Sequence, residues 1–119
     1  MEDFVTFEIA KKLKEKGFNW ICFHYYRTKC KDLFMVFPCE DWSDIEERIN
    51  APTISQVLKW LRKKYKIHIV VNYDYSQLWG WTVKYCDGRV ADYVDNSSLY
   101  YFYEEAALAG IEYVLDNLV

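Results

Sequence analysis

The stretch "APTISQVLKWLRKKYKIHIVVNY", from Ala51 to Tyr73, decides the fold because it joins an amphipathic helix to an alternating strand. Thr53 stands three residues before Gln56, and this capping-box spacing predicts that a helix begins there. From Lys66 to Tyr73 every second residue is apolar and points to one side, which predicts a strand with one buried face. On the helix, the apolar face holds Ile54, Val57, Leu58, Leu61 and Tyr65, and the opposite face holds Ser55, Lys59, Arg62 and Lys66.

The segment that follows predicts a hairpin. "LWGWTVKYC", Leu78 to Cys86, alternates in the same way as the preceding strand, with Trp79 and Trp81 on the apolar side. Asp87 and Gly88 are typical turn residues, and they predict a further short edge strand over residues 89–94.

The segment before the deciding stretch predicts one helix and two strands. Thr6 is a good N-cap and Gly17 stands where a helix commonly ends, so a helix is expected between them. Aromatic and β-branched residues predict strands over 19–27 and 33–37, which Pro38 ends. An acidic connector over 39–50 leads into the second helix.

The C-terminal stretch "SSLYYFYEEAALAGIEYVLDNLV", Ser97 to Val119, predicts a third helix from Tyr103 onward. Phenylalanine cannot cap a helix, so Phe102 is expected to be buried, and Tyr103 is expected to pack at the flank of the apolar stripe. At most one or two of the four consecutive rings, Tyr100 or Tyr101, are then left for the surface.

The element order αββ-αββ-α, with the extra strand as an option, predicts the fold class. Hairpins with helices on one face favour an α+β two-layer sandwich, with a mainly antiparallel sheet of four to five strands and three helices. A chain of 119 residues with 52% hydrophobic content is expected to form one domain over residues 1–119. The two αββ halves also suggest an old duplication.

Composition limits the function classes. The formal net charge of −3 argues against bulk attraction to a polyanion, and the hydrophobic content argues against disorder. Neither a signal peptide nor a membrane-spanning run is visible, so a cytoplasmic location without membrane contact is expected. The four cysteines are accordingly expected to be reduced thiols.

Three blocks together resemble a known family. "TFEIAKKLKEKGF", "INAPTISQVLKWLRKKY" and "YEEAALAGIEYVL" occur in the same order as in a family of short, uncharacterised proteins from gut bacteria and their phages and mobile elements. The resemblance spans nearly the whole chain and implies no activity, cofactor or catalytic residue. Family members place a serine before the Tyr-Glu-Glu-Ala piece, where this chain has Phe102.

Metal binding and catalysis find little support in the residue pattern. Cys22 and His24 would share a strand face, but no C-x-x-C pair accompanies them, so neither a metal nor another cofactor is expected. His68 with Asp74, or Cys22 as a nucleophile, is the nearest approach to a catalytic set. A nucleophile elbow and a phosphate-binding glycine loop are both missing, so we expect no catalytic residues and no enzyme.

Two binding surfaces remain as hypotheses. The first is a protein partner, or a second copy of the chain, held through aromatic and apolar residues. The alternative is nucleic acid, bound by cations interleaved with one ring, against which stands the simpler interpretation of a solvated helix face. The first surface would use Phe34, Val36, Tyr93, Tyr100 and Tyr101, and the second Lys59, Trp60, Arg62, Lys63 and Lys66.

Overall fold

The computed structural model describes residues 3–20, 22–28, 31, 33–35, 48–73, 77–86 and 94–119. The chain divides into two compact units, residues 1–53 and residues 54–119, and each is described here by itself. The single domain expected over residues 1–119 stays a prediction.

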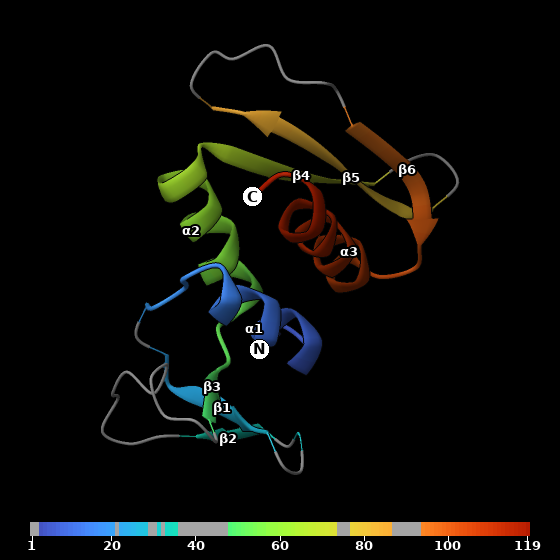
Figure 1. Cartoon of the computed structure of the whole chain (residues 1–119). Helices are drawn as coiled ribbons and strands as arrows, with labels where there is room; N and C mark the ends of the chain where they lie inside the picture. Colours follow the sequence, from blue (N-terminus) through green and yellow to red (C-terminus); the bar gives the residue numbers. More distant parts are fainter. Residues whose placement is uncertain are drawn as a thin grey trace. The chain divides into compact units, whose positions relative to one another are not determined.

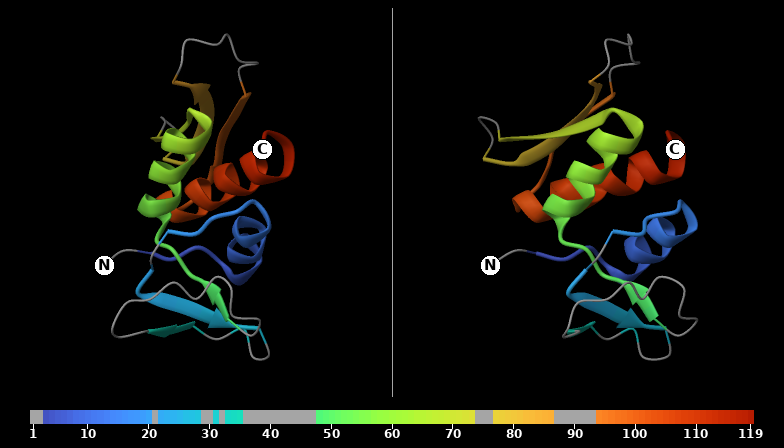
Figure 2. Two further views of the ribbon diagram at one scale, coloured as in Figure 1. Left: turned by 60° about the vertical axis from the view of Figure 1, so that its left-hand side comes forward. Right: turned by 90° about the vertical axis from the view of Figure 1, so that its left-hand side faces the viewer.

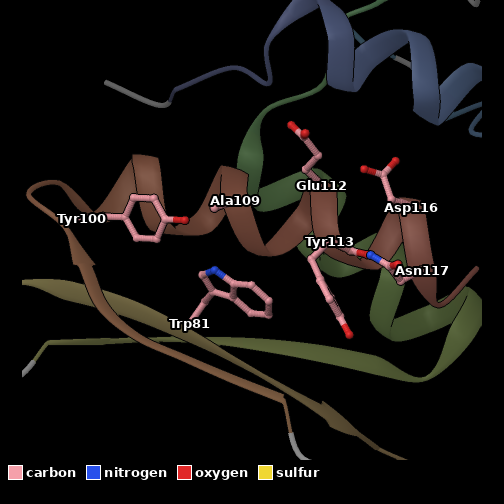
Figure 3. Close-up of a pocket in the computed structure, with 7 residues that line it drawn as sticks. All are labelled: Trp81, Tyr100, Ala109, Glu112, Tyr113, Asp116 and Asn117. Atoms are coloured by element: carbon pink, nitrogen blue, oxygen red, sulfur yellow. The ribbon is translucent and has the colours of Figure 1, made fainter.

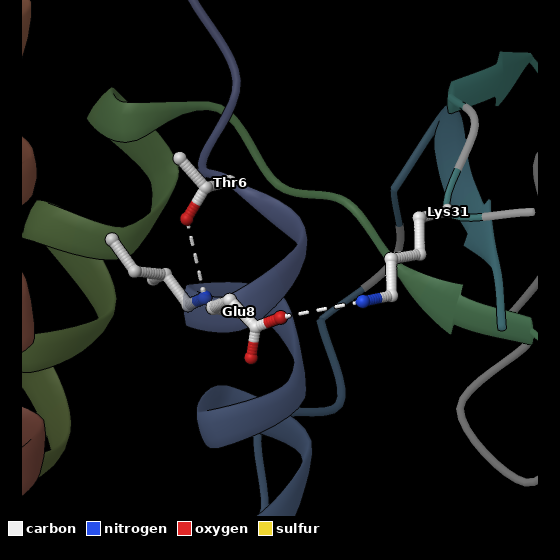
Figure 4. Close-up of polar contacts among 4 residues, drawn as sticks. Thr6, Glu8 and Lys31 are labelled. Carbon is white, nitrogen blue, oxygen red and sulfur yellow. Dashed lines mark hydrogen bonds and ion pairs between the residues drawn. The ribbon is translucent and has the colours of Figure 1, made fainter.

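The N-terminal unit begins with helix α1 (Phe7–Glu15), and both of its ends follow the sequence. The hydroxyl of Thr6 accepts a hydrogen bond from the amide of Ile9 at 3.3 Å (Figure 4). At the other end Gly17 adopts a φ of 87°, which lets the amide of Phe18 donate to the carbonyl of Leu13 at 3.0 Å. The predicted N-cap and C-terminal glycine are therefore both confirmed.

The sheet of the N-terminal unit has β1 (His24–Arg27) at its centre, between β2 (Leu33–Met35) and β3 (Arg48–Asn50). Both pairings are antiparallel. The hydroxyl of Tyr26 donates to the carbonyl of Val5 at 2.6 Å and so ties β1 to the segment before α1. The short strand β3 falls within the segment that the sequence predicts as a connector, since three residues are too few to show an alternating pattern.

A surface ion pair connects α1 to the turn after β1. Lys31 Nζ lies 3.9 Å from Glu8 Oε1, with both side chains more than 60% exposed (Figure 4). The same ammonium lies 5.3 Å from the centroid of the Phe7 ring. Solvent screens such exposed pairs, so this contact adds little to the free energy of unfolding.

The C-terminal unit is a two-layer arrangement. Its sheet runs β4 (Ile67–Tyr73), β5 (Trp79–Tyr85), β6 (Val94–Tyr100), with all neighbours antiparallel. Helices α2 (Ile54–Tyr65) and α3 (Tyr103–Asn117) lie on the same face of this sheet (Figures 1 and 2). The predicted second and third helices and the hairpin of β4 and β5 are therefore present.

The core of the C-terminal unit is built from the alternating side chains that face the two helices. A Cβ added to Gly110 of α3 would lie 2.9 Å from Ile69 Cγ2 and 3.2 Å from Trp81 Cγ, so the helix approaches the sheet where it has no side chain. The buried sheet residues are Ile67, Ile69, Trp81 and Val83, and the helices add Val57, Trp60, Leu61, Ala107, Ile111 and Val114.

The fold class is α+β with three helices, as the sequence predicts, but the described strands form two three-stranded sheets. This corrects the single sheet of four to five strands and the order αββ-αββ-α. Periodicity identifies strands, whereas pairing depends on contacts distant in sequence, here β3 with β1. The central strand is the first of three in one unit and the second of three in the other, so the units do not repeat one topology.

Candidate functional site

Five aromatic residues of the C-terminal unit form what we call the aromatic surface. They gather where β4 ends, β5 begins and β6 leads into α3. Tyr73 is 56% exposed, Tyr101 76%, Phe102 62% and Tyr103 39%, and Trp79 is half-buried among them. Single exposed apolar residues are normal on a protein surface, but several large rings in one place mark a binding site.

Ring contacts hold part of this surface in place. Tyr73 stands directly opposite Trp79 in the β4–β5 pairing, and their ring centroids are 4.8 Å apart with planes tilted by 54°. Tyr103 also meets Trp79, edge to face, with centroids 5.5 Å apart and an angle of 89°. Such pairs stabilise a fixed arrangement by about 0.5–1.5 kcal/mol each beyond simple burial.

Phe102 is 62% exposed, which corrects the expectation that it would be buried, whereas Tyr103, expected to pack at the flank of the apolar stripe, packs against Trp79 and keeps 39% of its surface exposed. Phe102 is the N-cap of α3, with extended backbone and no capping side-chain bond, as its chemistry predicts. The buried stripe of α3 starts only at Ala106, one turn later. The spacing of apolar residues predicts the direction in which Tyr103 points but does not predict where the core beneath it ends.

Negative charge borders the aromatic surface. Glu104 and Glu105 lie in the first turn of α3, where carboxylates also interact favourably with the helix dipole. The whole helix carries Glu104, Glu105, Glu112 and Asp116 and has no lysine or arginine. This border disfavours the approach of a phosphate backbone to the rings.

The structure describes both the backbone and the side chain of two of the five predicted partner-binding residues, Tyr100 and Tyr101. Tyr101 is the most exposed ring of the aromatic surface. Tyr100 is half-buried at the end of β6 and belongs to the wall of a nearby pocket. Phe34 lies in β2, but its side chain, like Val36 and Tyr93, lies outside what the structure describes.

The pocket beside Tyr100 lies between β5 and α3 and has a volume of about 360 Å³. The rings of Trp81 and Tyr113 are 5.1 Å apart there, and the indole Nε1 is buried with no hydrogen-bond partner among the described residues. Figure 3 shows the carboxylates of Glu112 and Asp116 pointing away from Trp81. The polar groups therefore do not converge on one point, as a catalytic pocket requires. The lining residues are Trp81, Tyr100, Ala109, Glu112, Tyr113, Asp116 and Asn117.

Three of the cations proposed to bind nucleic acid, Lys59, Arg62 and Lys63, lie on the side of α2 away from its buried face, and Lys66 follows the helix with a φ of 60°. Lys59, Lys63 and Lys66 are exposed and Arg62 is half-buried. Trp60, however, is only 2% exposed, and its ring meets Tyr65 edge to face at 5.3 Å. Lys64 Nζ lies 5.3 Å from the centroid of this ring. Because the ring itself belongs to the core, it is not available to stack on a base.

The two histidines belong to different units. His24 in β1 lies against Phe4, with ring centroids 4.3 Å apart. His68 in β4 is half-buried, and burial first, then the positive charges of Arg62 and Lys84, lower its pKa below the ordinary value. Asp74, the predicted orienting carboxylate, lies outside the described residues.

Among the described residues, the cysteines and the other potential metal ligands form no further site. Cys22 is buried and its thiol donates to the carbonyl of Trp20 at 3.4 Å, and Cys86 is exposed. Cys30 and Cys39 lie outside the described residues. Within the described part of the chain, no group of three or more His, Cys, Asp or Glu side chains could hold a metal ion.

Comparisons with known proteins add no assignment. No protein-family model matches the chain, and no curated protein or solved structure matches it. None of the helices within the described ranges is long and apolar enough to cross a membrane.

Proposed function

We propose that this chain acts by binding a protein partner through the aromatic surface, without catalysing a reaction. One observation carries the proposal: Tyr73, Tyr101 and Phe102 are each more than half exposed at one end of the C-terminal unit. Tyrosine and other large rings are enriched at the centres of protein interfaces, where a few of them supply most of the affinity.

The geometry of the rings favours a protein over other ligands of aromatic surfaces. Sugars and successive nucleic-acid bases bind best to rings that present flat, parallel faces. Here Trp79 is tilted by 54° to Tyr73 and by 89° to Tyr103, so the surface is uneven. Glu104 and Glu105 at its border favour a partner with an apolar centre and a basic rim.

A double substitution tests this proposal. Tyr101→Ser with Phe102→Ser removes the two most exposed rings of the surface, and because both side chains are mostly exposed we expect the variant to fold. The matched control is Phe23→Ser with Met35→Ser in the N-terminal unit, where the side chains are 59% and 70% exposed.

The measurement has two stages. A partner is identified by affinity capture from cells that express the chain, and its dissociation constant is then measured with purified components. We expect the double variant to weaken binding by about tenfold or more, and the control to leave it unchanged. Equal binding by both variants would exclude the aromatic surface. Sedimentation of the chain alone decides whether the partner is a second copy.

Nucleic-acid binding by α2 remains the alternative, supported by one observation. Residues 54–73 and 77–86 contain no aspartate or glutamate, so the cations of α2 face no carboxylate from these segments. Arg62→Glu with Lys63→Glu should abolish salt-sensitive binding to single-stranded DNA or RNA. The absence of binding by the native chain at low salt would end this alternative.

The remaining parts of the proposal rest on sequence. The resemblance to proteins of gut bacteria and their mobile elements supports a role as an accessory factor in the cytoplasm. We propose no cofactor, since the chain has no cofactor-binding motif.

A further inference from the structure

The indole N–H of Trp81 is buried without an acceptor. Trp81 is 3% exposed, and its Nε1 has no hydrogen-bond partner among the described residues. A buried tryptophan N–H ordinarily finds a partner, because a donor that is removed from water and left unpaired costs free energy. The indole of Trp81 therefore lacks an acceptor that the described part of the chain does not supply.

This donor belongs to the wall of the pocket between β5 and α3. Trp81 lines that pocket, and Figure 3 shows its indole nitrogen on the edge of the ring that is turned toward α3. The pocket volume of about 360 Å³ lies at the lower end of the range for ligand sites, so it suits a ligand of one or two rings. An unpaired donor thus stands beside a cavity of ligand size.

Two tyrosines flank the indole in this pocket. The ring centroid of Tyr113 lies 5.1 Å from that of Trp81, with the planes tilted by 40°, and Tyr100 lies on the other side of Trp81 in Figure 3. Both tyrosines are half-buried, so each keeps ring surface that a ligand can cover. Ala109 lines the helix side with only a methyl group, which leaves room for a flat ring between the tyrosines.

Tyr100 is the wall through which a ligand can reach the indole N–H. Its side chain makes no hydrogen bond and no ring contact with another described residue, whereas Tyr113 is held against Trp81. A half-buried side chain without such contacts changes rotamer readily. Rotation of Tyr100 would open the edge of the indole to a ligand in the pocket.

We infer that this pocket binds an uncharged aromatic ligand whose carbonyl oxygen or ring nitrogen accepts the hydrogen bond of Trp81 Nε1. Aromatic amides and neutral heterocycles with a keto group belong to this class. The pocket is lined by no lysine or arginine, so a carboxylate or phosphate would enter without a cation to balance its charge. A cationic ring that carries only donors would leave the indole N–H unpaired.

The inference goes beyond the proposed protein partner and does not rest on it. The pocket has no residue in common with the aromatic surface, which consists of Tyr73, Trp79, Tyr101, Phe102 and Tyr103. Loss of partner binding would leave the pocket intact, and an empty pocket would leave the aromatic surface intact. Either proposal can therefore fail without the other.

The test adds benzamide, which combines one ring with one neutral carbonyl, to the isotope-labelled full chain. NMR follows the assigned indole N–H signal of Trp81 during the titration. We expect saturable binding with a dissociation constant of about 1 mM, as is usual for so small a ligand, and a downfield shift of the indole proton as its hydrogen bond forms. No saturable binding, or saturation that leaves this signal unmoved, would overturn the inference.

Two further compounds of the same shape test the acceptor and the charge. Benzoate replaces the neutral amide by an anion, and benzamidine replaces the carbonyl by donors alone. We expect each to bind about tenfold or more weakly than benzamide, because each leaves a charge or a donor unpaired. Binding of either compound as tight as that of benzamide would show that the pocket does not recognise a neutral acceptor.

Ala109→Leu tests where benzamide binds. Leucine fills the pocket from α3 and is a good helix former, so we expect the variant to fold and to bind benzamide about tenfold or more weakly. The matched control is Glu105→Leu, which adds the same side chain at an exposed position of α3 outside the pocket and should change the affinity less than about twofold. Equal affinities of the two variants would contradict the assigned pocket. The titrations of the native chain decide the inference even if Ala109→Leu does not fold.

Discussion

The indole of Trp79 and the ring of Tyr103 meet edge to face, with centroids 5.5 Å apart and planes at 89°. This contact connects the start of β5 to the first turn of α3 and fixes two rings of the aromatic surface relative to each other. A surface held in its binding arrangement loses less conformational entropy when a partner docks. We therefore expect the same contact to contribute to stability and, under the proposed function, to recognition.

A double-mutant cycle measures that contact. Trp79→Leu and Tyr103→Leu keep apolar volume but remove the edge-to-face geometry. We expect a coupling free energy of about 0.5–1.5 kcal/mol between the two substitutions, measured by urea unfolding. Tyr101→Leu paired with Trp79→Leu serves as the control and should show no coupling, since Tyr101 is 76% exposed. Additive effects of the first pair would show that the contact contributes nothing.

Gly110→Ala should destabilise the C-terminal unit although alanine is the better helix former. The propensity gain is about 1 kcal/mol. The new Cβ would lie 2.9 Å from Ile69 Cγ2 and 3.2 Å from Trp81 Cγ, and relieving such overpacking costs about 1–3 kcal/mol. We therefore expect a net loss of about 1 kcal/mol in urea unfolding. Ala109→Gly, one residue away on the half-buried side, is the comparison. A more stable Gly110→Ala variant would contradict the close approach of α3 to the sheet.

Tyr26→Phe tests the packing of the N-terminal unit. The substitution removes the hydroxyl that donates to the Val5 carbonyl at 2.6 Å but keeps the ring that meets Phe7 at 5.8 Å. We expect a loss of about 1 kcal/mol in the free energy of unfolding. Tyr101→Phe, whose side chain is 76% exposed, is the control for removing a tyrosine hydroxyl.

Burial also raises the pKa of Tyr26 above its ordinary value. The unfolded chain therefore loses this proton first, and stability should fall as the pH rises above about 10. That alkaline loss should be smaller in Tyr26→Phe. An identical pH profile for both proteins would show that Tyr26 ionises alike in the folded and unfolded chain.

His68 should make the C-terminal unit sensitive to acid. Its pKa is lowered in the folded chain by burial and by Arg62 and Lys84, so the unfolded chain binds the proton at a higher pH. Stability is then constant above about pH 6.5 and decreases as the pH falls below that value, until the folded form is protonated too. His68→Gln should flatten this part of a stability profile measured by urea unfolding between neutral and mildly acidic pH. An unchanged slope would assign the acid sensitivity to other groups.

Local patterns in the sequence predict most elements of the fold. The Thr6 N-cap, the Gly17 terminus and the alternation of β4 and β5 each act through neighbouring residues, and all three appear in the structure. The pairing of β3 with β1 depends instead on contacts more than twenty residues apart in sequence, for which one sequence gives no signal. The optional edge strand is predicted over residues 89–94, of which 89–93 lie outside the described residues, and β6 spans Val94–Tyr100. The centre of β6 reads "DNSS", and this polar run does not predict a strand because it lacks the alternation of apolar and polar residues.

The candidate site was predicted only in part. The run Tyr100–Tyr103 stands out in the sequence, but Phe102 is expected to be buried because it cannot cap a helix, and helical spacing places Tyr103 at the flank of the apolar stripe. The buried residues of α3 begin only at Ala106, and how far the core extends under a helix is a property of the assembled unit. Tyr73 joins Phe102 and Tyr103 only through the register that places it opposite Trp79. For Trp60 the prediction is wrong in the other direction. Its ring, at the margin of the apolar stripe, was predicted to bind nucleic acid, but it is only 2% exposed.

The most direct test of the central claim is site-specific photo-crosslinking in cells that express the chain. A benzophenone amino acid replaces Phe102, which is 62% exposed in the aromatic surface, or Phe23, which is 59% exposed in the N-terminal unit. We predict a discrete crosslinked protein at position 102 that is absent at position 23 and is lost when Tyr101→Ser is added. Identical crosslinking at both positions, or none at position 102, would contradict a partner-binding role for the aromatic surface.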